Sequence, residues 1–357
     1  MSRPRIAVCG WIGSTNLGDE LIAEQVATMI VDAGGDPSFV TIDPEVGPAG
    51  FPRIRHGGAL DTIGLVGALR RHDGIVFGGG GLIQDETGPL NLPFHLTRLG
   101  VGRALRRPWA AIALGVGDVR RRSGRLLVKT VARGFVGASV RDVASADRFL
   151  SLTGVRPELG LDPVLDQPAR EVDATDHVVV SLRPINSPTQ RRLTDQTGPA
   201  AEQVATWASA IDAIADETGL GVRFVSWDDT YDHDIHERVA AHLRVPVELE
   251  RPQVGDVIDR VGSGRLVVTM RYHGAVAAIV TGRRALLLDY SPKMASLAEE
   301  AGAGLRCVPP TAPADDISSA AVALLGEPAP TGVGDAAERA DVNRRVISDL
   351  VAAASAR

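Results

Sequence analysis

Short apolar runs alternate with helix-like stretches through the first half of the chain. The runs are apolar at consecutive positions, which is typical of parallel strands that are covered on both faces. The pattern predicts strands at residues 5–9, 38–42, 74–77, 110–114 and 138–140. It predicts helices at residues 19–30, 61–71, 125–134 and 144–150. This alternation indicates an α/β domain built on a parallel sheet.

The same alternation restarts after residues 159–176, a segment that is rich in Pro and Asp and has no helical period. Strands are predicted at residues 177–182, 222–226, 246–249, 266–269 and 285–289, and helices at residues 199–218, 233–243, 254–262, 272–281, 317–325 and 336–354. We therefore predict an N-terminal α/β domain over residues 1–165, a second over 175–330 and a C-terminal helix over 335–357. Two doubly wound domains that face each other would bind ligands in an interdomain cleft, beyond the carboxyl ends of their strands.

Composition agrees with two well-packed domains. The chain has 357 residues, of which 44% are hydrophobic, and about 150 residues per domain is usual. No apolar run reaches the ~18 residues of a membrane span, and the N-terminal stretch becomes polar too early for a signal peptide. We therefore expect a cytoplasmic protein. The net charge of −6 argues against general affinity for nucleic acid.

Basic residues are concentrated in one segment. Between Gly102 and Gly134 there are nine basic residues and one acidic residue, Asp118. A solvated helix face that acids elsewhere balance is the favoured interpretation. The alternative is a surface that meets an anionic partner such as lipid phosphate, and so a peripheral contact with the inner face of the membrane.

Two segments after predicted strands are candidates for contacts with a ligand. Four glycines, Gly78–Gly81, follow the strand at 74–77 and precede Gln84 and Asp85. They would let the backbone approach a ligand and present N–H groups at a helix start, although a tight turn alone is the alternative. The spacing of these glycines matches neither the G-x-G-x-x-G motif nor the G-x-x-x-x-G-K-[S/T] motif of nucleotide-binding proteins. In the loop after the first strand, Asn16 and Asp19 suit sugar hydroxyls, unless Asp19 only caps a helix.

Cationic side chains also follow strands. Arg141 comes directly off the strand at 138–140, where its guanidinium suits a carboxylate or phosphate, although an ion-pair role is the more common one. Asp142 beside it would orient Arg141 or cap the next helix. Lys293, one of only two lysines, lies in a predicted turn after a strand, which suggests a specific need for a compact ammonium group.

His273 is the candidate acid or base. It follows the strand at 266–269 and lies near the positive end of the next helix, which favours a neutral imidazole. A histidine packed in the core is the alternative, and Arg271 two residues earlier favours the functional interpretation. Residues 228–236 contain four aspartates and two histidines, which suggests either a divalent-metal site or, as we favour, the capping of a helix.

Taken in order, these motifs resemble the polysaccharide pyruvyl transferase family. The matching elements are Asn16-Leu17-Gly18-Asp19, the run from Gly78 to Asp85, Ser139-Val140-Arg141-Asp142, Leu161-Asp162-Pro163, Ser181-Leu182-Arg183, Met270-Arg271-Tyr272-His273 and Tyr290-Ser291-Pro292-Lys293. The resemblance spans residues 5–300. It implies a glycosyltransferase-B-like fold of two facing α/β domains, and transfer of a pyruvyl group from phosphoenolpyruvate to a sugar, usually as a ketal.

The resemblance also implies roles for single residues. His273 would supply the proton, and Arg141, Arg183, Arg271 and Lys293 would bind phosphoenolpyruvate. The expected acceptor contacts are Asn16, Asp19, Gly80, Gly81, Gln84 and Asp85. The acceptor would be a sugar or glycolipid precursor of a cell-wall polymer or exopolysaccharide. No metal or cofactor is expected besides phosphoenolpyruvate as co-substrate, because cationic side chains neutralise the phosphate. Tyr272 replaces the family's usual leucine, so the identity of the acceptor does not transfer.

Three alternatives share most of these features. A nucleotide-sugar-dependent glycosyltransferase would have the same fold, and phosphate release from phosphoenolpyruvate would distinguish the two. A pyruvyl transferase that modifies a small secondary metabolite would keep the chemistry. A sugar-binding protein without catalysis would retain its function after His273→Ala.

Overall fold

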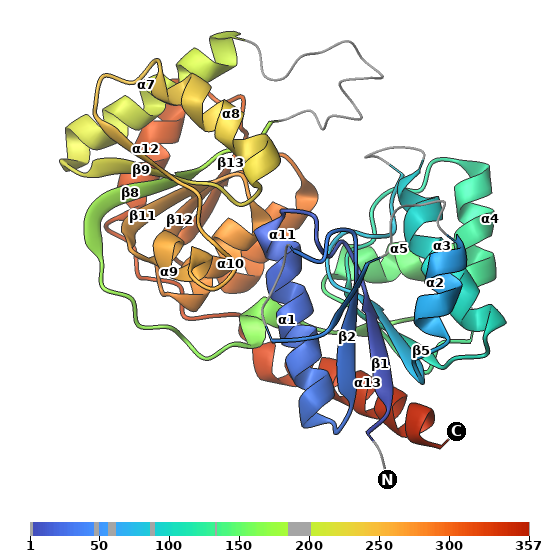
Figure 1. Cartoon of the computed structure of the whole chain (residues 1–357). Helices are drawn as coiled ribbons and strands as arrows, with labels where there is room; N and C mark the ends of the chain where they lie inside the picture. The colour runs from blue at the N-terminus through green and yellow to red at the C-terminus, as the bar shows by residue number, and fades with distance from the viewer. Residues whose placement is uncertain are drawn as a thin grey trace. The chain divides into compact units, whose positions relative to one another are not determined.

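The computed structural model describes residues 3–45, 50–55, 62–85, 90–132, 134–184 and 201–356. The chain forms two compact units (Figure 1). Unit 1 comprises Met1–Ser14, Asp19–Asp166 and Asp335–Arg357, and unit 2 comprises Thr15–Gly18 and Gln167–Gly334. The predicted first residues of two helices, Asp61 and Pro199, lie outside the described residues, as does Arg133 of the basic segment.

The sheet of unit 1 has seven parallel strands in the order β3-β2-β1-β4-β5-β6-β7. They are β1 (Arg5–Cys9), β2 (Asp36–Thr41), β3 (Arg53–Arg55), β4 (Gly74–Gly78), β5 (Trp109–Leu114), β6 (Ala138–Val140) and β7 (Glu158–Leu159). One face is covered by α2 (Thr62–Leu69), α3 (Asn91–Ala104), α4 (Arg122–Val131) and α5 (Val143–Thr153), and the other by α1 (Leu17–Asp32) and α13 (Ala336–Ser355) (Figure 1).

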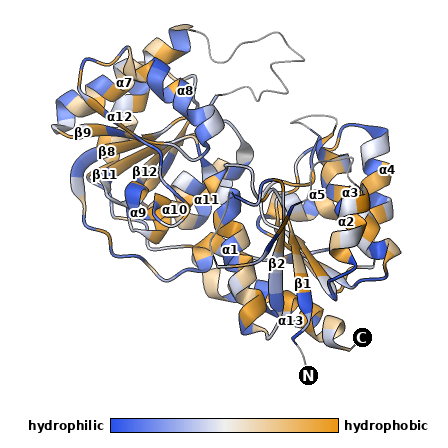
Figure 2. Cartoon of the chain, in the orientation of Figure 1, coloured by the Kyte–Doolittle hydropathy of each residue, from blue (hydrophilic) through white to orange (hydrophobic). Residues whose placement is uncertain are grey.

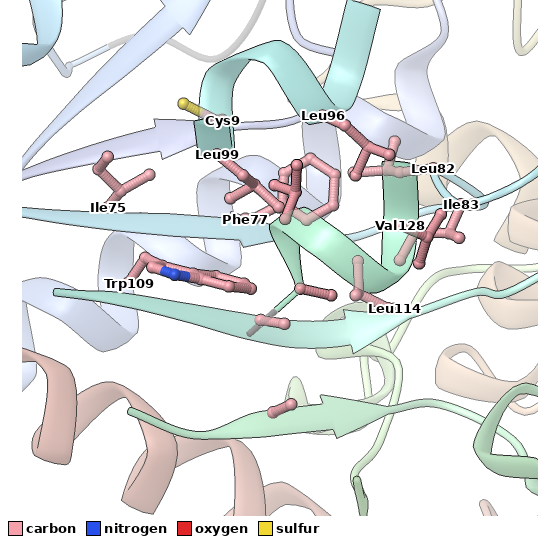
Figure 3. Packing of buried hydrophobic residues seen from close by; sticks show 14 of the residues in the cluster. Cys9, Ile75, Phe77, Leu82, Ile83, Leu96, Leu99, Trp109, Leu114 and Val128 are labelled. Atoms are coloured by element: carbon pink, nitrogen blue, oxygen red, sulfur yellow. The ribbon is translucent and has the colours of Figure 1, made fainter. Parts of the chain in front are cut away.

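Helix α3 is part of the core of unit 1 although the sequence pattern did not predict it. Leu96 and Leu99 pack with Phe77 of β4 and Val128 of α4 (Figure 3). Each such side chain stabilises the fold by roughly 1.5–3 kcal/mol when fully buried. The glycines of α3 hid the pattern, and Gly102 is required by packing because an added Cβ would overlap Ile75.

The sheet of unit 2 has six parallel strands in the order β10-β9-β8-β11-β12-β13. They are β8 (Thr175–Ser181), β9 (Gly221–Val225), β10 (Val247–Glu250), β11 (Gly264–Thr269), β12 (Arg284–Leu288) and β13 (Leu305–Val308). On one face lie α7 (Ala201–Thr218), α8 (Asp229–Ala240) and α12 (Ala314–Leu324), and on the other α9 (Val257–Gly262), α10 (Tyr272–Val280) and α11 (Pro292–Ala301) (Figure 1). In both units the strands are mostly hydrophobic, whereas the helices that cover them carry both hydrophobic and hydrophilic residues (Figure 2). The predicted fold class of two parallel α/β domains is confirmed.

The strand order of each sheet reverses beside the first strand of that sheet. In unit 1 the reversal lies between β1 and β4, and in unit 2 between β8 and β11. The loops that leave two such strands diverge, and open α/β sheets bind their ligands at this point. The glycine-rich segments follow β1 and β4, whereas Arg183 and Arg271 follow β8 and β11.

Helix α13 belongs to unit 1 although it is last in the sequence. Asn343, fully buried in this helix, donates from Nδ2 to the Leu161 carbonyl (2.7 Å) and accepts at Oδ1 from the Ser139 hydroxyl (2.6 Å). Arg339 donates from Nε to the Gly160 carbonyl (2.9 Å). These buried bonds join α13 to the segments on either side of α5.

Candidate functional site

A buried ion pair fixes Arg271 at the carboxyl edge of the sheet of unit 2. Its Nε donates to Asp232 Oδ2 (3.0 Å), and its Nη2 donates to Asp232 Oδ1. Asp232 is fully buried and also accepts the backbone N–H groups of Trp227 and Asp228. Burial alone would lower the pKa of Arg271, but the charge and hydrogen bonds of Asp232 raise it. The guanidinium is therefore charged and held in one orientation.

A second cationic group surrounds the Tyr290 hydroxyl, two residues after β12. Arg183 Nη1 donates to Tyr290 Oη (2.7 Å). Lys293 Nζ lies 5.7 Å from the ring centroids of both Tyr290 and Tyr272. Burial would raise the pKa of Tyr290, but the positive charges of Lys293, Arg183 and Arg271 lower it to about 7. The electrostatic potential at this point is therefore strongly positive and suits a multiply charged anion.

His273 lies in the first turn of α10, where it is half-buried. Its ring is 6.2 Å from that of Trp227 and 5.4 Å from that of Tyr272, measured between centroids. On another side it meets Gly18, where an added Cβ would overlap Nδ1 of the imidazole. Only glycine at position 18 therefore allows this loop to lie against the imidazole.

The loop Thr15–Gly18 is held on unit 2 by hydrogen bonds. Thr15 Oγ1 donates to Asp228 Oδ1 (3.0 Å), and the Leu17 N–H donates to the Trp227 carbonyl (2.8 Å). Thr15 has φ 68°, a strained conformation for this residue type that such bonds must maintain. Asn16 Oδ1 accepts the Gly18 N–H (3.3 Å) at the start of α1, so Asn16, not Asp19, is the capping residue.

Unit 2 therefore contains four of the predicted site residues at one edge of its sheet. They are Arg183 after β8, Arg271 and His273 after β11, and Lys293 after β12. The prediction of a turn around Lys293 was wrong, because α11 begins at Pro292 and places Lys293 in its first turn. Proline is favoured at the first position of a helix, where no N–H is needed.

The glycine run in unit 1 forms a left-handed turn. Gly79 and Gly80 have φ of 77° and 79°, and an added Cβ on Gly80 would overlap Oδ1 of Asp19. Gly81 is exposed and has open space around it. No helix begins directly after the run, contrary to expectation, because positive φ values interrupt helical geometry and α3 starts only at Asn91. The run brings the backbone beside the Asp19 carboxylate.

Asp85 and Gln84 connect this turn to neighbouring elements. Asp85 accepts the backbone N–H groups of Arg120 (3.0 Å) and Arg121 (2.9 Å) just before α4. Burial raises the pKa of this carboxyl, but these bonds and the two arginine charges hold it below its usual range. The Gln84 carbonyl accepts from Asn91 Nδ2 (2.7 Å). Contacts of both residues with an acceptor stay a prediction.

Arg141 lies in unit 1 and forms an ion pair. It is 5% exposed, and its Nη1 donates to Asp162 Oδ2 (3.1 Å). An added Cβ on Gly115 would lie 3.1 Å from Nη2. Asp142 caps α5 by accepting the Ser145 N–H (2.7 Å). Binding of phosphoenolpyruvate by Arg141 stays a prediction.

The segment 228–236 is used for capping and packing. Asp228 caps α8 and Asp232 binds Arg271. Nε2 of His236 lies 3.0 Å from the Leu182 nitrogen, and burial lowers the pKa of this imidazole to about 4. Within the part of the chain that the structure describes, no three His, Cys, Asp or Glu side chains are grouped so as to hold a metal ion.

The structure gives three residues a role that sequence reasoning did not predict for them. Asp232 and Tyr290 contact the predicted cations, as described above. Glu20 is fully buried in α1, and its Oε1 accepts the Gly13 N–H (2.6 Å). Burial raises the pKa of Glu20 to about 7. The sequence offered one signal that Glu20 is buried: it directly precedes Leu21 and Ile22, which are also buried.

Several solved structures resemble the fold of this protein over nearly its whole chain. The UDP-N-acetylglucosamine 2-epimerase from Rickettsia bellii has 9% identity and a TM-score of 0.64, with 99% of this chain and 98% of that chain covered. The UDP-GlcNAc 2-epimerase from Methanocaldococcus jannaschii, solved with UDP-GlcNAc and UDP, has 12% identity and a TM-score of 0.59 (94% and 98% covered). The glycotransferase of kitacinnamycin has 14% identity and a TM-score of 0.53 (99% and 97% covered). These likenesses establish a glycosyltransferase-B-like fold.

The family is established by sequence. Residues 16–292 match the family described as polysaccharide pyruvyl transferase. The chain belongs to this family and is therefore a transferase. No protein of curated function has a significant sequence match to the chain.

Proposed function

We propose that the protein transfers the pyruvyl group of phosphoenolpyruvate to two hydroxyls of a sugar acceptor, with release of phosphate. The observation that carries this proposal is the group of three cations at one sheet edge of unit 2, Arg183, Arg271 and Lys293, together with His273. Phosphoenolpyruvate carries a carboxylate and a phosphate. Guanidinium and ammonium groups bind such anions by charge-assisted hydrogen bonds.

The reaction begins when His273 donates a proton to C3 of the substrate. C2 becomes oxocarbenium-like, and an acceptor hydroxyl attacks it and gives up its proton. The phosphate then leaves with the electrons of its bond to C2. A second hydroxyl attacks C2, loses its proton and closes the ketal ring. Of the two hydroxyl protons, one replaces the proton that His273 donated and the other balances the released phosphate.

The cations act on the charge that develops at the leaving phosphate. Because Asp232 and the buried surroundings fix Arg271 before the substrate binds, little reorganisation is needed during the reaction. Asp232 is a positioning residue, since it acts through the guanidinium. We assign Arg141 to the same substrate as a further contact. For the acceptor we propose the turn at Gly80 and Gly81 with Asp19, and contacts from Asn16, Gln84 and Asp85.

The experiment that tests this function is incubation of the full chain with phosphoenolpyruvate and separate panels of lipid-linked, nucleotide-linked and free sugars. We expect phosphate release that depends on the acceptor, and by mass spectrometry a product that carries one pyruvate ketal per phosphate released. Glycosyl transfer from a nucleotide sugar without consumption of phosphoenolpyruvate would instead establish a glycosyltransferase.

Lys293→Ala is expected to raise the KM for phosphoenolpyruvate by about 10- to 100-fold. A hydrogen bond to a charged group contributes about 1.5–3 kcal/mol, and each 1.4 kcal/mol corresponds to a factor of ten in affinity. Steady-state rates at varied phosphoenolpyruvate concentration measure the change. Arg265→Ala is the matched control, because this exposed cation pairs with Asp176 at the opposite end of β11. An unchanged KM in Lys293→Ala would exclude the ammonium group from the substrate site.

A further inference from the structure

Helix α4 has a basic outer face. Its Gly124, Val128 and Val131 are buried on unit 1, and its Arg122, Arg125 and Lys129 are exposed. These three cations are spaced three and four residues apart, so they lie on the same side of the helix. Exposed Arg120 and Arg121 precede the helix. Figure 2 shows α4 with alternating hydrophilic and hydrophobic segments on the outside of unit 1.

An exposed leucine lies among these cations. Leu126 is 66% exposed although Val128, two residues later, is completely buried. The outer face therefore combines a large apolar side chain with cations on both sides of it. This combination is typical of helices that lie in the interface of a membrane, where the apolar residue enters the headgroup region and Lys and Arg extend toward phosphate.

In the described part of the chain, no acid forms an ion pair with the cations of α4 itself. Arg122 and Lys129 form no ion pair with any residue in the described ranges, and Arg125 donates from Nε to the Val119 carbonyl (2.7 Å). Two acids lie before the helix: Asp118 pairs with Arg148, and Asp85 accepts the backbone N–H groups of Arg120 and Arg121, whose charges lower its pKa. The positive charge of α4 is therefore directed to solvent, although the whole chain has a net charge of −6.

We propose that the outer face of α4, formed by Arg121, Arg122, Arg125, Leu126 and Lys129, is a docking surface for a membrane that contains anionic phospholipid. A net negative protein has no general attraction to polyanions, so binding requires this local face. The exposed leucine favours a lipid surface over a dissolved polyanion, because only the lipid surface offers an apolar region. None of the described helices has the length and apolarity needed to cross a membrane.

The test is cosedimentation of the full chain with vesicles of phosphatidylglycerol and phosphatidylcholine, and with vesicles of phosphatidylcholine alone. We expect binding to the anionic vesicles only, and weaker binding as the salt concentration rises. Each cation near an anionic surface contributes about a fivefold factor in partitioning. Arg122→Glu/Lys129→Glu should therefore lower partitioning at least 25-fold, and Leu126→Ser should lower it at constant charge.

The matched control is Arg156→Glu/Arg265→Glu, which makes the same change in net charge at exposed positions outside α4. Its binding should change less than threefold. Absence of binding by the unaltered protein, an equal loss in the control, or α4-dependent binding to an acidic polysaccharide but not to vesicles would each overturn the proposal. The substituted side chains are exposed, and an unchanged melting temperature checks the fold. Because the assay uses no substrate, its outcome is independent of the proposed reaction.

Discussion

His273→Ala is expected to lower kcat about 10²- to 10⁴-fold, the usual contribution of a general acid. The substitution removes the group that we assign to protonation of C3, whereas Arg183, Arg271 and Lys293 would still bind phosphoenolpyruvate. The KM for phosphoenolpyruvate should therefore change much less than kcat. Phosphate release at saturating substrate measures the effect.

His242→Ala is the matched control for this prediction, because His242 is exposed and follows α8, away from the carboxyl ends of the strands. Its kcat should equal that of the unaltered protein. The melting temperature of His273→Ala should stay within a few degrees, since this side chain is half-buried. A kcat near the original value in His273→Ala would assign the proton to another group.

Asp232→Ala is expected to destabilise unit 2 by about 3–5 kcal/mol. The substitution leaves the Arg271 guanidinium buried without its partner, and it also removes the acceptor of the Trp227 and Asp228 N–H groups. Urea unfolding measures the loss of stability. Asp232→Asn keeps the volume but removes the charge, and it should raise the KM for phosphoenolpyruvate more than it lowers kcat.

The control for this prediction is Asp216→Ala, which breaks the exposed ion pair with Arg244. Exposed pairs contribute about 0–1 kcal/mol, so its unfolding midpoint should barely move. Equal and small losses in Asp216→Ala and Asp232→Ala would show that the buried pair does not hold Arg271. An unchanged KM in Asp232→Asn would show that the orientation of Arg271 is unimportant for the substrate.

Most strands of both sheets could be predicted from sequence, because buried parallel strands are continuous apolar runs. Strands β3, β7 and β13 were not predicted, because they are short and only partly buried. Helix α3 could not be predicted, since its pattern is interrupted by glycines, and one of these, Gly102, is explained only by the nearby Ile75. Helix α11 was also not predicted: residues 290–293 were interpreted as a turn, whereas Pro292 occupies the first position of a helix. Local patterns also say nothing of strand order, which places β4 beside β1.

Part of the candidate site could be predicted from the positions of the strands. Arg183, Arg271 and His273 directly follow strands, and the carboxyl ends of parallel strands share one edge. The pairing of Arg271 with Asp232 could not be predicted, because 39 positions separate the two residues. The ordered motifs supplied the family, and the structure adds the partners that fix the orientation of its charged groups.

The return of α13 to unit 1 has a consequence for protein synthesis. Leu350 and Ala354 of this helix pack near Gly74 of β4, and Arg339 donates to the carbonyl of Arg141 (2.6 Å). Domains usually complete their folding in the order in which the ribosome makes them. Here the nascent chain can close unit 2 while part of the unit 1 sheet still lacks its cover. Unit 1 therefore needs the last residues of the chain as well as the first half to complete its fold.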